Sequence, residues 1–204
     1  PGGFVRPDET TEQAARRELR EETGLDHVYM EQLYTFSDPG RDPRTWVMSC
    51  SYMALIDSSK VFITAGDDAD NARWFHISFH LMDEHTDYPV PADTEAPRVI
   101  RVQHYKLELT GGSTCLSSII EKCITKTEND TIIDYRITEN NGLAFDHARI
   151  ITYALERLRG KVEYSGLALH LMPSEFTLTQ LQQVYEVILG KRLLKAAFRR
   201  KAAS

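Results

Sequence analysis

The sequence predicts an α+β fold, because helical and strand-like hydrophobic periods alternate along the chain. Residues 11–23 have the period of a helix, and residues 28–56 contain two runs rich in β-branched and aromatic side chains. Residues 78–142 are polar with short strand-like runs, and a helical period returns from Phe145. We therefore expect strands and helices with a β-meander insert and a helical C-terminal module.

The first predicted helix, residues 11–23, carries its own start and stop signals. Thr10 and Gln13 have the spacing of a capping box, in which each side chain bonds the backbone N–H of the other residue. Gly24 stands where a left-handed C-cap is expected. Both ends of this helix are thus predicted from local signals.

Strands are predicted on both sides of a turn rich in Asp, Pro and Gly. Residues 28–36 and 46–56 are expected to pair, and residues 72–75 form another short strand. The segment 80–97, rich in His, Asp and Pro, is expected to be a loop. The rest of the insert is expected to hold three strands, at residues 102–109, 115–126 and 131–138.

The C-terminal part is predicted to be helical. Residues 145–160 place apolar side chains on one face and end near Gly160, and three shorter helices follow, at 165–171, 177–189 and from Arg192 onward. The last two form a helix, short turn, helix unit. Its final segment, 191–201, carries six positive and no negative charges, which is typical of a helix that binds DNA.

The composition is that of a globular chain, with 42% hydrophobic and 26% charged residues. No apolar run approaches the roughly 18 residues of a membrane span, and no charged-then-apolar leader opens the sequence, so no membrane is expected as a partner and the expected location is the cytoplasm. Three cysteines without a Cys-x-x-Cys motif argue against a disulfide framework or a zinc site.

Charge divides the chain into two modules. Residues 145–204 contain ten basic and five acidic side chains, whereas residues 1–144 contain 14 and 25, giving net charges of +5 and −11. We predict one domain at 1–144, with the insert at 78–142, and a second module at 145–204. Because Pro1 leads directly into a Gly-Gly turn, we expect the first domain to lack its N-terminal strands. An acidic module suits a cation, and a basic one suits a polyanion.

Three carboxylates lie within one turn of the first helix. Glu18, Glu21 and Glu22 stand at i, i+3 and i+4, so they project from one side of it. Like charges at this spacing repel unless a divalent cation neutralises them, and carboxylate oxygens suit Mg²⁺ or Mn²⁺. Such a metal can bridge pyrophosphate oxygens and lower the pKa of a bound water. The alternative is a solvated acidic helix face.

The spacing of these residues resembles the box of the Nudix hydrolase family at every fixed position. Gly3 is followed after five residues by Glu9 and, after seven more, by the run from Arg17 to Leu25. The resemblance implies a Nudix fold, with a mixed β-sheet sandwiched between helices. It also implies catalytic roles: Glu21 and Glu22 as principal metal ligands, Glu18 as a third ligand or the base, Arg17 as an ion-pairing orienter, Glu9 near the metals or paired with Arg17, and Gly3 in the tight turn beside metal and substrate.

Other segments are similar to Nudix proteins that handle ADP-ribose, at residues 41–44, 65–69 and 143–147. Arg41 and Arg44 are candidates to clamp a phosphate or to stack on a base, and a polar hairpin loop is the alternative. The acidic run at 67–70 either supplies a further metal ligand or base or is an ordinary acidic turn.

The tail, residues 176–201, resembles the winged-helix extension of Nudix-type transcriptional repressors of NAD metabolism, without the wing, so a partial winged-helix module is expected. The alternative is a solvated basic face. The candidate DNA-binding residues are Lys191, Arg192, Lys195, Arg199, Arg200 and Lys201.

Two functions therefore follow from the resemblance. The first is Mg²⁺-dependent hydrolysis of a nucleoside diphosphate derivative, with ADP-ribose cleaved to AMP and ribose 5-phosphate as the favoured reaction. The second is a transcription regulator that senses ADP-ribose and binds duplex DNA. A third possibility is an enzyme for another phosphoanhydride. The resemblance also implies a homodimer.

Overall fold

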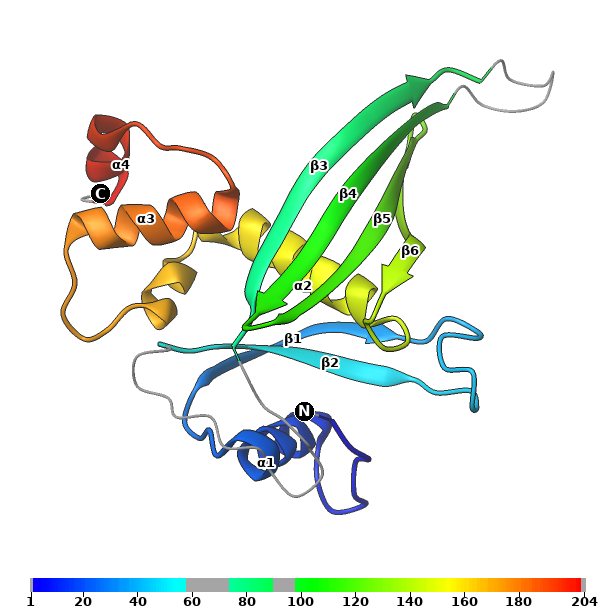
Figure 1. Cartoon of the computed structure of the whole chain (residues 1–204), viewed down its shortest axis with the longest axis horizontal. Coiled ribbons are helices and arrows are strands. Elements are labelled where there is room, and N and C mark those ends of the chain that lie inside the picture. Colours follow the sequence, from blue (N-terminus) through cyan, green and yellow to red (C-terminus); the bar gives the residue numbers. More distant parts are fainter. Residues whose placement is uncertain (1, 58–73, 90–97, 203–204) are drawn as a thin grey trace. The chain divides into compact units, whose positions relative to one another are not determined.

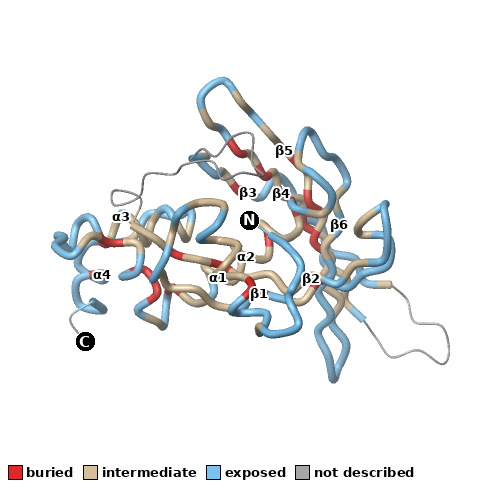
Figure 2. The backbone as a smooth tube through the Cα atoms, turned by 90° about the horizontal axis from the view of Figure 1, so that it is seen from below, coloured by how far each residue is buried: buried red, intermediate tan, exposed pale blue. Residues whose placement is uncertain are grey.

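The computed structural model describes residues 2–57, 74–89 and 98–202, and these fall into two compact units. The first unit comprises residues 1–40, 45–73 and 153–204, and the second comprises residues 41–44 and 74–152. Figure 1 shows the elements of both along the chain. Each unit has its own buried residues, which Figure 2 marks in red along the backbone.

The first unit begins with helix α1 and a two-stranded antiparallel sheet. Helix α1 spans Thr11–Thr23, β1 spans Tyr29–Phe36 and β2 spans Ser49–Leu55. The pairing of β1 with β2 confirms the predicted hairpin. A hydrogen bond of 2.8 Å between the hydroxyls of Thr11 and Tyr52 joins α1 to β2.

Four helical elements follow the sheet strands in the chain, and the first of them begins in the second unit, to which residues 147–152 belong. Helix α2 spans His147–Val162, the 3₁₀ helix η2 spans Gly166–Leu171, α3 spans Leu178–Leu189 and α4 spans Lys195–Ala202. Helix α2 continues past Gly160, where it was predicted to end, and its last residue, Val162, is fully buried. Packing of Val162 therefore outweighs the weak helix propensity of one glycine.

The second unit contains a four-stranded antiparallel meander. Its strands are β3 (His76–Asp87), β4 (Val99–Gly111), β5 (Thr114–Lys126) and β6 (Thr131–Asn141), paired in that order. Figure 1 shows them side by side. The buried residues Phe79, Leu107 and Ile120 occupy one face, and the Phe79 ring stacks on Tyr105 at 4.7 Å. The other face carries polar residues such as His104 and Glu108.

Three sequence expectations need correction or qualification. Strand β3 runs through residues 80–87, which were predicted to be a loop, because this edge strand is mostly exposed and its polar composition hides it. Trp74 and Phe75 are not in a strand, and the rest of the strand predicted at 72–75 lies outside the described residues. Every strand pair within the described ranges is antiparallel, so the parallel pair that a mixed sheet needs is not among them.

Two smaller expectations can also be compared with the structure. In the part of the chain that the structure describes, no helix is long and apolar enough to cross a membrane. The three cysteines, Cys50, Cys115 and Cys123, are free thiols.

Candidate functional site

Helix α1 presents the box carboxylates from a helix whose ends are both capped. The Thr10 hydroxyl accepts a hydrogen bond from the backbone N–H of Gln13, and the Gln13 side chain accepts one from Thr10 N–H. Gly24 closes the helix at φ 71°, in the left-handed region that favours glycine. The predicted caps are confirmed, and they place Glu18, Glu21 and Glu22 within one helical turn.

Arg17 lies at the centre of the carboxylates. Its guanidinium donates hydrogen bonds of 3.0 and 2.7 Å to the two oxygens of Glu9, one of 3.1 Å to Glu21, and a further one to Glu18. It also donates to the backbone carbonyl of Phe4 at 3.3 Å. The Arg17 and Glu9 side chains are each only 12% exposed, so this pair forms the partly buried base of the site.

The same contacts set the ionisation of the site. Hydrogen bonds from the Arg17 side chain, and then from the backbone N–H of Arg6, lower the pKa of Glu9 to about 2. Hydrogen bonds from Arg17 to Glu9 and Glu18 raise the pKa of the guanidinium. Glu9 is therefore ionised at any pH near neutrality and keeps Arg17 in place.

The loop before α1 approaches the carboxylates through glycine backbone. The Gly2 N–H donates a hydrogen bond of 2.9 Å to Oε1 of Glu22. A Cβ atom at Gly3 would overlap the carboxylate of Glu18, so no other residue fits there without displacing it. Only a residue without a side chain lets the loop lie this close to Glu18.

The carboxylates have the chemistry that a magnesium ion requires, but they do not form a ready ligand set. Glu18 and Glu21 are hydrogen-bonded to Arg17, and Glu22 is bonded to the Gly2 amide. Among the described residues, no three acidic, histidine or cysteine side chains stand close enough together to hold an ion. Binding a divalent cation would require Glu18 and Glu21 to turn from Arg17 while Glu9 retains it.

Arg41 and Arg44 belong to the second unit. The guanidinium of Arg41 pairs with Asp146 through hydrogen bonds of 2.8 and 3.1 Å, and its side chain is 8% exposed. Arg44 pairs with Asp42 at 2.7 Å and lies over the Phe145 ring, 4.8 Å from its centroid. The Arg44 side chain is 72% exposed, so it is more accessible than Arg41 to an incoming group.

Phe145 and Asp146 were not singled out individually by the sequence analysis. Phe145 has φ 47°, which is unusual for a residue other than glycine, and its side chain is exposed beside Arg44. Asp146 directly precedes α2, and its backbone carbonyl accepts hydrogen bonds from the N–H groups of Arg149 and Ile150 in the first turn of that helix. The resemblance of segment 143–147 to Nudix proteins that handle ADP-ribose was the only sequence feature that pointed to these two residues. Their contacts with residues 41–44 join positions too far apart in the sequence to predict.

The acidic residues Asp67, Asp68 and Asp70 lie outside the described residues.

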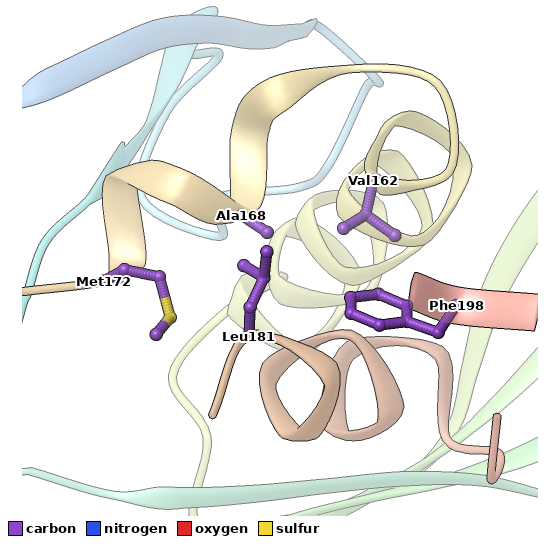
Figure 3. Close-up of a cluster of buried hydrophobic side chains, with 5 residues drawn as sticks. All are labelled: Val162, Ala168, Met172, Leu181 and Phe198. Atoms are coloured by element: carbon purple, nitrogen blue, oxygen red, sulfur yellow. The ribbon is translucent and has the colours of Figure 1, made fainter. Parts of the chain in front are cut away.

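The C-terminal helices form a helix, turn, helix unit around a small apolar core. Figure 3 shows Val162, Leu181 and Phe198 converging from α2, α3 and α4. Helix α3 has the same kind of capping box as α1, formed by Thr177 and Gln180. The buried Phe198 anchors α4.

Glu186 holds the turn between α3 and α4. Its carboxylate accepts hydrogen bonds of 2.9 Å from the backbone N–H of Leu193 and from the side chain of Gln182. These two bonds, the backbone one first, lower the pKa of Glu186. Because Leu193 is held in this way, α4 begins at Lys195 and not at Arg192 as predicted.

The six candidate DNA-binding residues occupy two positions. Lys191 and Arg192 are in the turn, where Lys191 pairs with Glu163 at 3.4 Å. The other four are exposed on α4: Lys195, Arg199, Arg200 and Lys201. Because Phe198 faces inward, the cations around it are directed to the surface of the helix.

Two family models match parts of this chain. Residues 1–92 match the NUDIX domain, and residues 168–204 match the NrtR DNA-binding winged helix domain. The crystal structure of Shewanella oneidensis NrtR resembles this chain with a TM-score of 0.59 and 25% identity, covering 100% of this chain and 68% of NrtR. The structure of NrtR complexed with a 27mer DNA gives the same TM-score and identity and covers 67% of that protein.

Two curated proteins are also similar. The ADPR responsive transcriptional repressor NtrR of Acinetobacter baylyi is 30% identical over 203 residues, which are 98% of this chain and 58% of the repressor. An ADP-ribose pyrophosphatase of Methanocaldococcus jannaschii is 42% identical over 78 residues, 38% of this chain and 45% of the enzyme. The chain thus spans little more than half of the repressor's length. The predicted α+β fold is confirmed, and the chain carries a Nudix domain followed by a winged-helix domain of the NrtR type.

Proposed function

We propose that the chain is a DNA-binding regulator whose Nudix domain binds ADP-ribose. The observation that carries this proposal is the outward cationic surface of α4, held by Phe198 within a domain that matches the NrtR winged helix. The relatives whose names describe a repressor and a DNA complex align with 98% and 100% of this chain. Regulation therefore takes precedence over hydrolysis, which the sequence analysis placed first.

In this proposal, α4 contacts the phosphate backbone of duplex DNA. Lys195 and Arg199 are four residues apart, so they lie on one side of the helix. Arg200 and Lys201 extend the cationic surface, and Lys191 and Arg192 contribute from the turn. Cationic contacts of this type release counterions, so the affinity for DNA falls steeply as salt rises.

The proposed ligand-binding site is formed by the carboxylates of α1. A pyrophosphate is anionic and would be repelled by Glu18, Glu21 and Glu22, so we propose that it binds together with Mg²⁺ or Mn²⁺. The three carboxylates would hold the metal, Gly3 would let the backbone approach, and Arg17 would stay anchored on Glu9. Arg44 and Arg41, which lie in one loop of the second unit, stay separate candidates to clamp a phosphate or to stack on a base.

Fluorescence anisotropy with a labelled duplex tests the proposal. The full-length chain should bind the duplex with a strong salt dependence, and ADP-ribose with Mg²⁺ should change the affinity by at least about fivefold, the lower range of typical allosteric coupling. Ribose 5-phosphate is the matched control ligand, since it lacks the phosphoanhydride. Failure to bind any duplex in a library of random sequences at low salt would contradict DNA binding.

Hydrolysis is the second candidate, favoured by the presence of all three box carboxylates on α1. A bound Mg²⁺ would neutralise the phosphates and lower the pKa of an attacking water. Glu21 and Glu22 are proposed as its principal ligands, with Glu18 as third ligand or base. Release of AMP and ribose 5-phosphate from ADP-ribose, followed by chromatography, tests this function. A panel of dinucleotides and nucleotide sugars identifies any other phosphoanhydride substrate.

The domain boundary at 144/145, the cytoplasmic location and the homodimer also remain proposals. Analytical ultracentrifugation of the full-length chain tests the homodimer.

A further inference from the structure

The last two residues of α2, Lys161 and Val162, connect strand β1 to the basic helix α4. Lys161 donates a hydrogen bond of 2.7 Å to Oε2 of Glu31, near the start of β1. The next residue, Val162, is fully buried against Leu181 and Phe198. One short stretch of helix is therefore fixed to β1 by one side chain and to α4 by the next.

Glu31 is an unusual strand residue because its carboxylate is mostly buried. The side chain is 15% exposed, and Oε2 accepts hydrogen bonds from both Lys161 and the Tyr29 hydroxyl, the latter at 2.6 Å. Oε1 is buried and has no hydrogen-bond partner among the described residues. Burial raises the pKa of Glu31, but the hydrogen bonds from Lys161 and Tyr29, together with the positive charges of Lys161 and Arg157, outweigh it and leave the pKa lowered. A buried carboxylate held through one oxygen is costly without its partners.

Two neighbouring contacts also join β1 to the helical part of the first unit. The Tyr29 ring stacks on His170 in η2, with centroids 4.2 Å apart, and Arg157 donates a hydrogen bond of 3.0 Å to the carbonyl of Leu33. On the other side of the sheet pair, the Thr11 hydroxyl of α1 is bonded to Tyr52 of β2. A continuous set of contacts thus leads from α1 through β2 and β1 to α2 and α4.

We infer that Glu31 and Lys161 are positioning residues through which ligand at the α1 carboxylates changes the placement of α4. The inference rests on the proposed function and adds the path of contacts by which ligand binding at α1 affects α4. Movement of α1 shifts the β1–β2 pair, and the Glu31 carboxylate then pulls or releases Lys161. Since Val162 is buried against Phe198, the turn of α2 that moves Lys161 also moves α4. Coupling requires such a physical link between two sites.

The test compares ligand coupling in matched variants of the full-length chain. Glu31→Gln with Lys161→Met removes both charges and keeps the size of both side chains. The control is Lys106→Met with Glu108→Gln, which removes an ion pair of 2.8 Å on the meander sheet. The readouts are duplex affinity with and without ADP-ribose and Mg²⁺, and hydrogen exchange of amides 178–202 in the same two states.

In the wild type and the control, ligand should change exchange in α3 and α4 and duplex affinity by at least about fivefold. In the double variant both responses should fall to within about twofold of none, while affinity for ADP-ribose itself, by calorimetry, stays within about threefold of wild type. Lys161→Arg should retain the response, because the charge pair is preserved.

Each failure has a separate meaning. A double variant that keeps the full ligand response overturns the inference, as does a wild type that binds ligand without any change of exchange in α3 and α4. A wild type that binds no duplex overturns the proposed regulator, and the exchange measurement still decides the route in that case.

Discussion

Helices α1 and α3 begin and end in the same way but present different chemistry. Each starts with a Thr-x-x-Gln capping box, at Thr10 and Thr177, and each ends at a glycine with a positive φ, Gly24 and Gly190. Helix α3 buries Leu181 and joins an apolar core, whereas α1 buries only Ala14 and carries the box carboxylates. The caps therefore determine where each helix begins and ends, and the remaining side chains determine whether it packs in a core or presents charged groups.

Each helix also carries one charged side chain that organises the segment beside it. Arg17 on α1 binds Glu9 and the Phe4 carbonyl in the preceding loop. Glu186 on α3 binds the Leu193 amide in the following turn. The loop that Arg17 holds before α1 lies beside the box carboxylates, and the turn that Glu186 holds after α3 leads into the basic helix α4. The following predictions test this comparison.

The largest expected effect concerns the core beneath α4. Phe198→Ala should destabilise the winged-helix module by about 3–5 kcal/mol, since it removes a buried ring that contacts Tyr185 edge-on at 5.2 Å. Hydrogen exchange of the amides in α3 and α4, measured at increasing urea concentrations, gives the change in the free energy of unfolding. Val187→Ala is the control: this side chain on α3 is 76% exposed, and its loss should change stability by less than about 0.5 kcal/mol. Equal effects of the two substitutions would contradict the assigned core.

The next effect concerns the chemistry of α1. Glu22→Gln should weaken metal-dependent binding or turnover of ADP-ribose by about 100-fold, because it removes one charged ligand of the proposed metal. Calorimetry with Mg²⁺ and product analysis measure the two effects. Glu12→Gln, on the same helix but outside the box positions, should leave both unchanged. Undiminished metal-dependent activity in Glu22→Gln would remove the carboxylate assignment.

A smaller effect is expected at the helix ends, and it should be similar for both helices. Gly24→Ala and Gly190→Ala should each cost about 1–2 kcal/mol, because their φ angles of 71° and 64° are unfavourable for alanine. Gly160→Ala should have the opposite sign and stabilise by about 0.5–1 kcal/mol, since Gly160 is inside α2 and a Cβ there meets nothing within 4 Å. Thermal unfolding gives all three values, and a destabilising Gly160→Ala would argue against the helix continuing to Val162.

The smallest effect is a titration shift at the base of the α1 site. The pKa of Glu9 is about 2 in the folded chain, below its ordinary value of 4.5. Its contribution to stability is therefore fully present above about pH 4.5 and is lost as the pH falls toward 2. In Arg17→Gln the pKa should rise toward the ordinary value, as measured by NMR of the side-chain carboxyl. Arg6→Gln keeps the backbone N–H that bonds Glu9, so it should shift the pKa less; the reverse order would contradict the assigned cause.

The elements that the sequence predicted best are those set by local signals. The capping box of α1 needs only residues three apart, and the predicted ends of this helix match the observed ones. Helix α3 was predicted within one residue of its observed ends, although its capping box was not predicted. Strand β3 was missed because its polar edge residues do not alternate clearly. The ends of α2 and α4 depend on Val162 burial and on the Glu186–Leu193 bond, which are tertiary contacts.

The same division holds for the candidate site. Helical spacing was sufficient to place Glu18, Glu21 and Glu22 together. It was not sufficient to show that Arg17 bonds Glu18 and Glu21, because rotamers decide that contact. The pairing of Arg41 with Asp146 joins residues 105 positions apart, and no local pattern predicts such a contact.

The salt dependence of duplex binding tests the central claim most directly. A plot of log affinity against log salt concentration should have a steep negative slope for the wild type. Replacing Lys195 and Arg199 by glutamine should make that slope less negative by about two, since each phosphate contact contributes about 0.9. A slope that these substitutions leave unchanged, or binding that does not depend on salt, would show that α4 does not contact DNA.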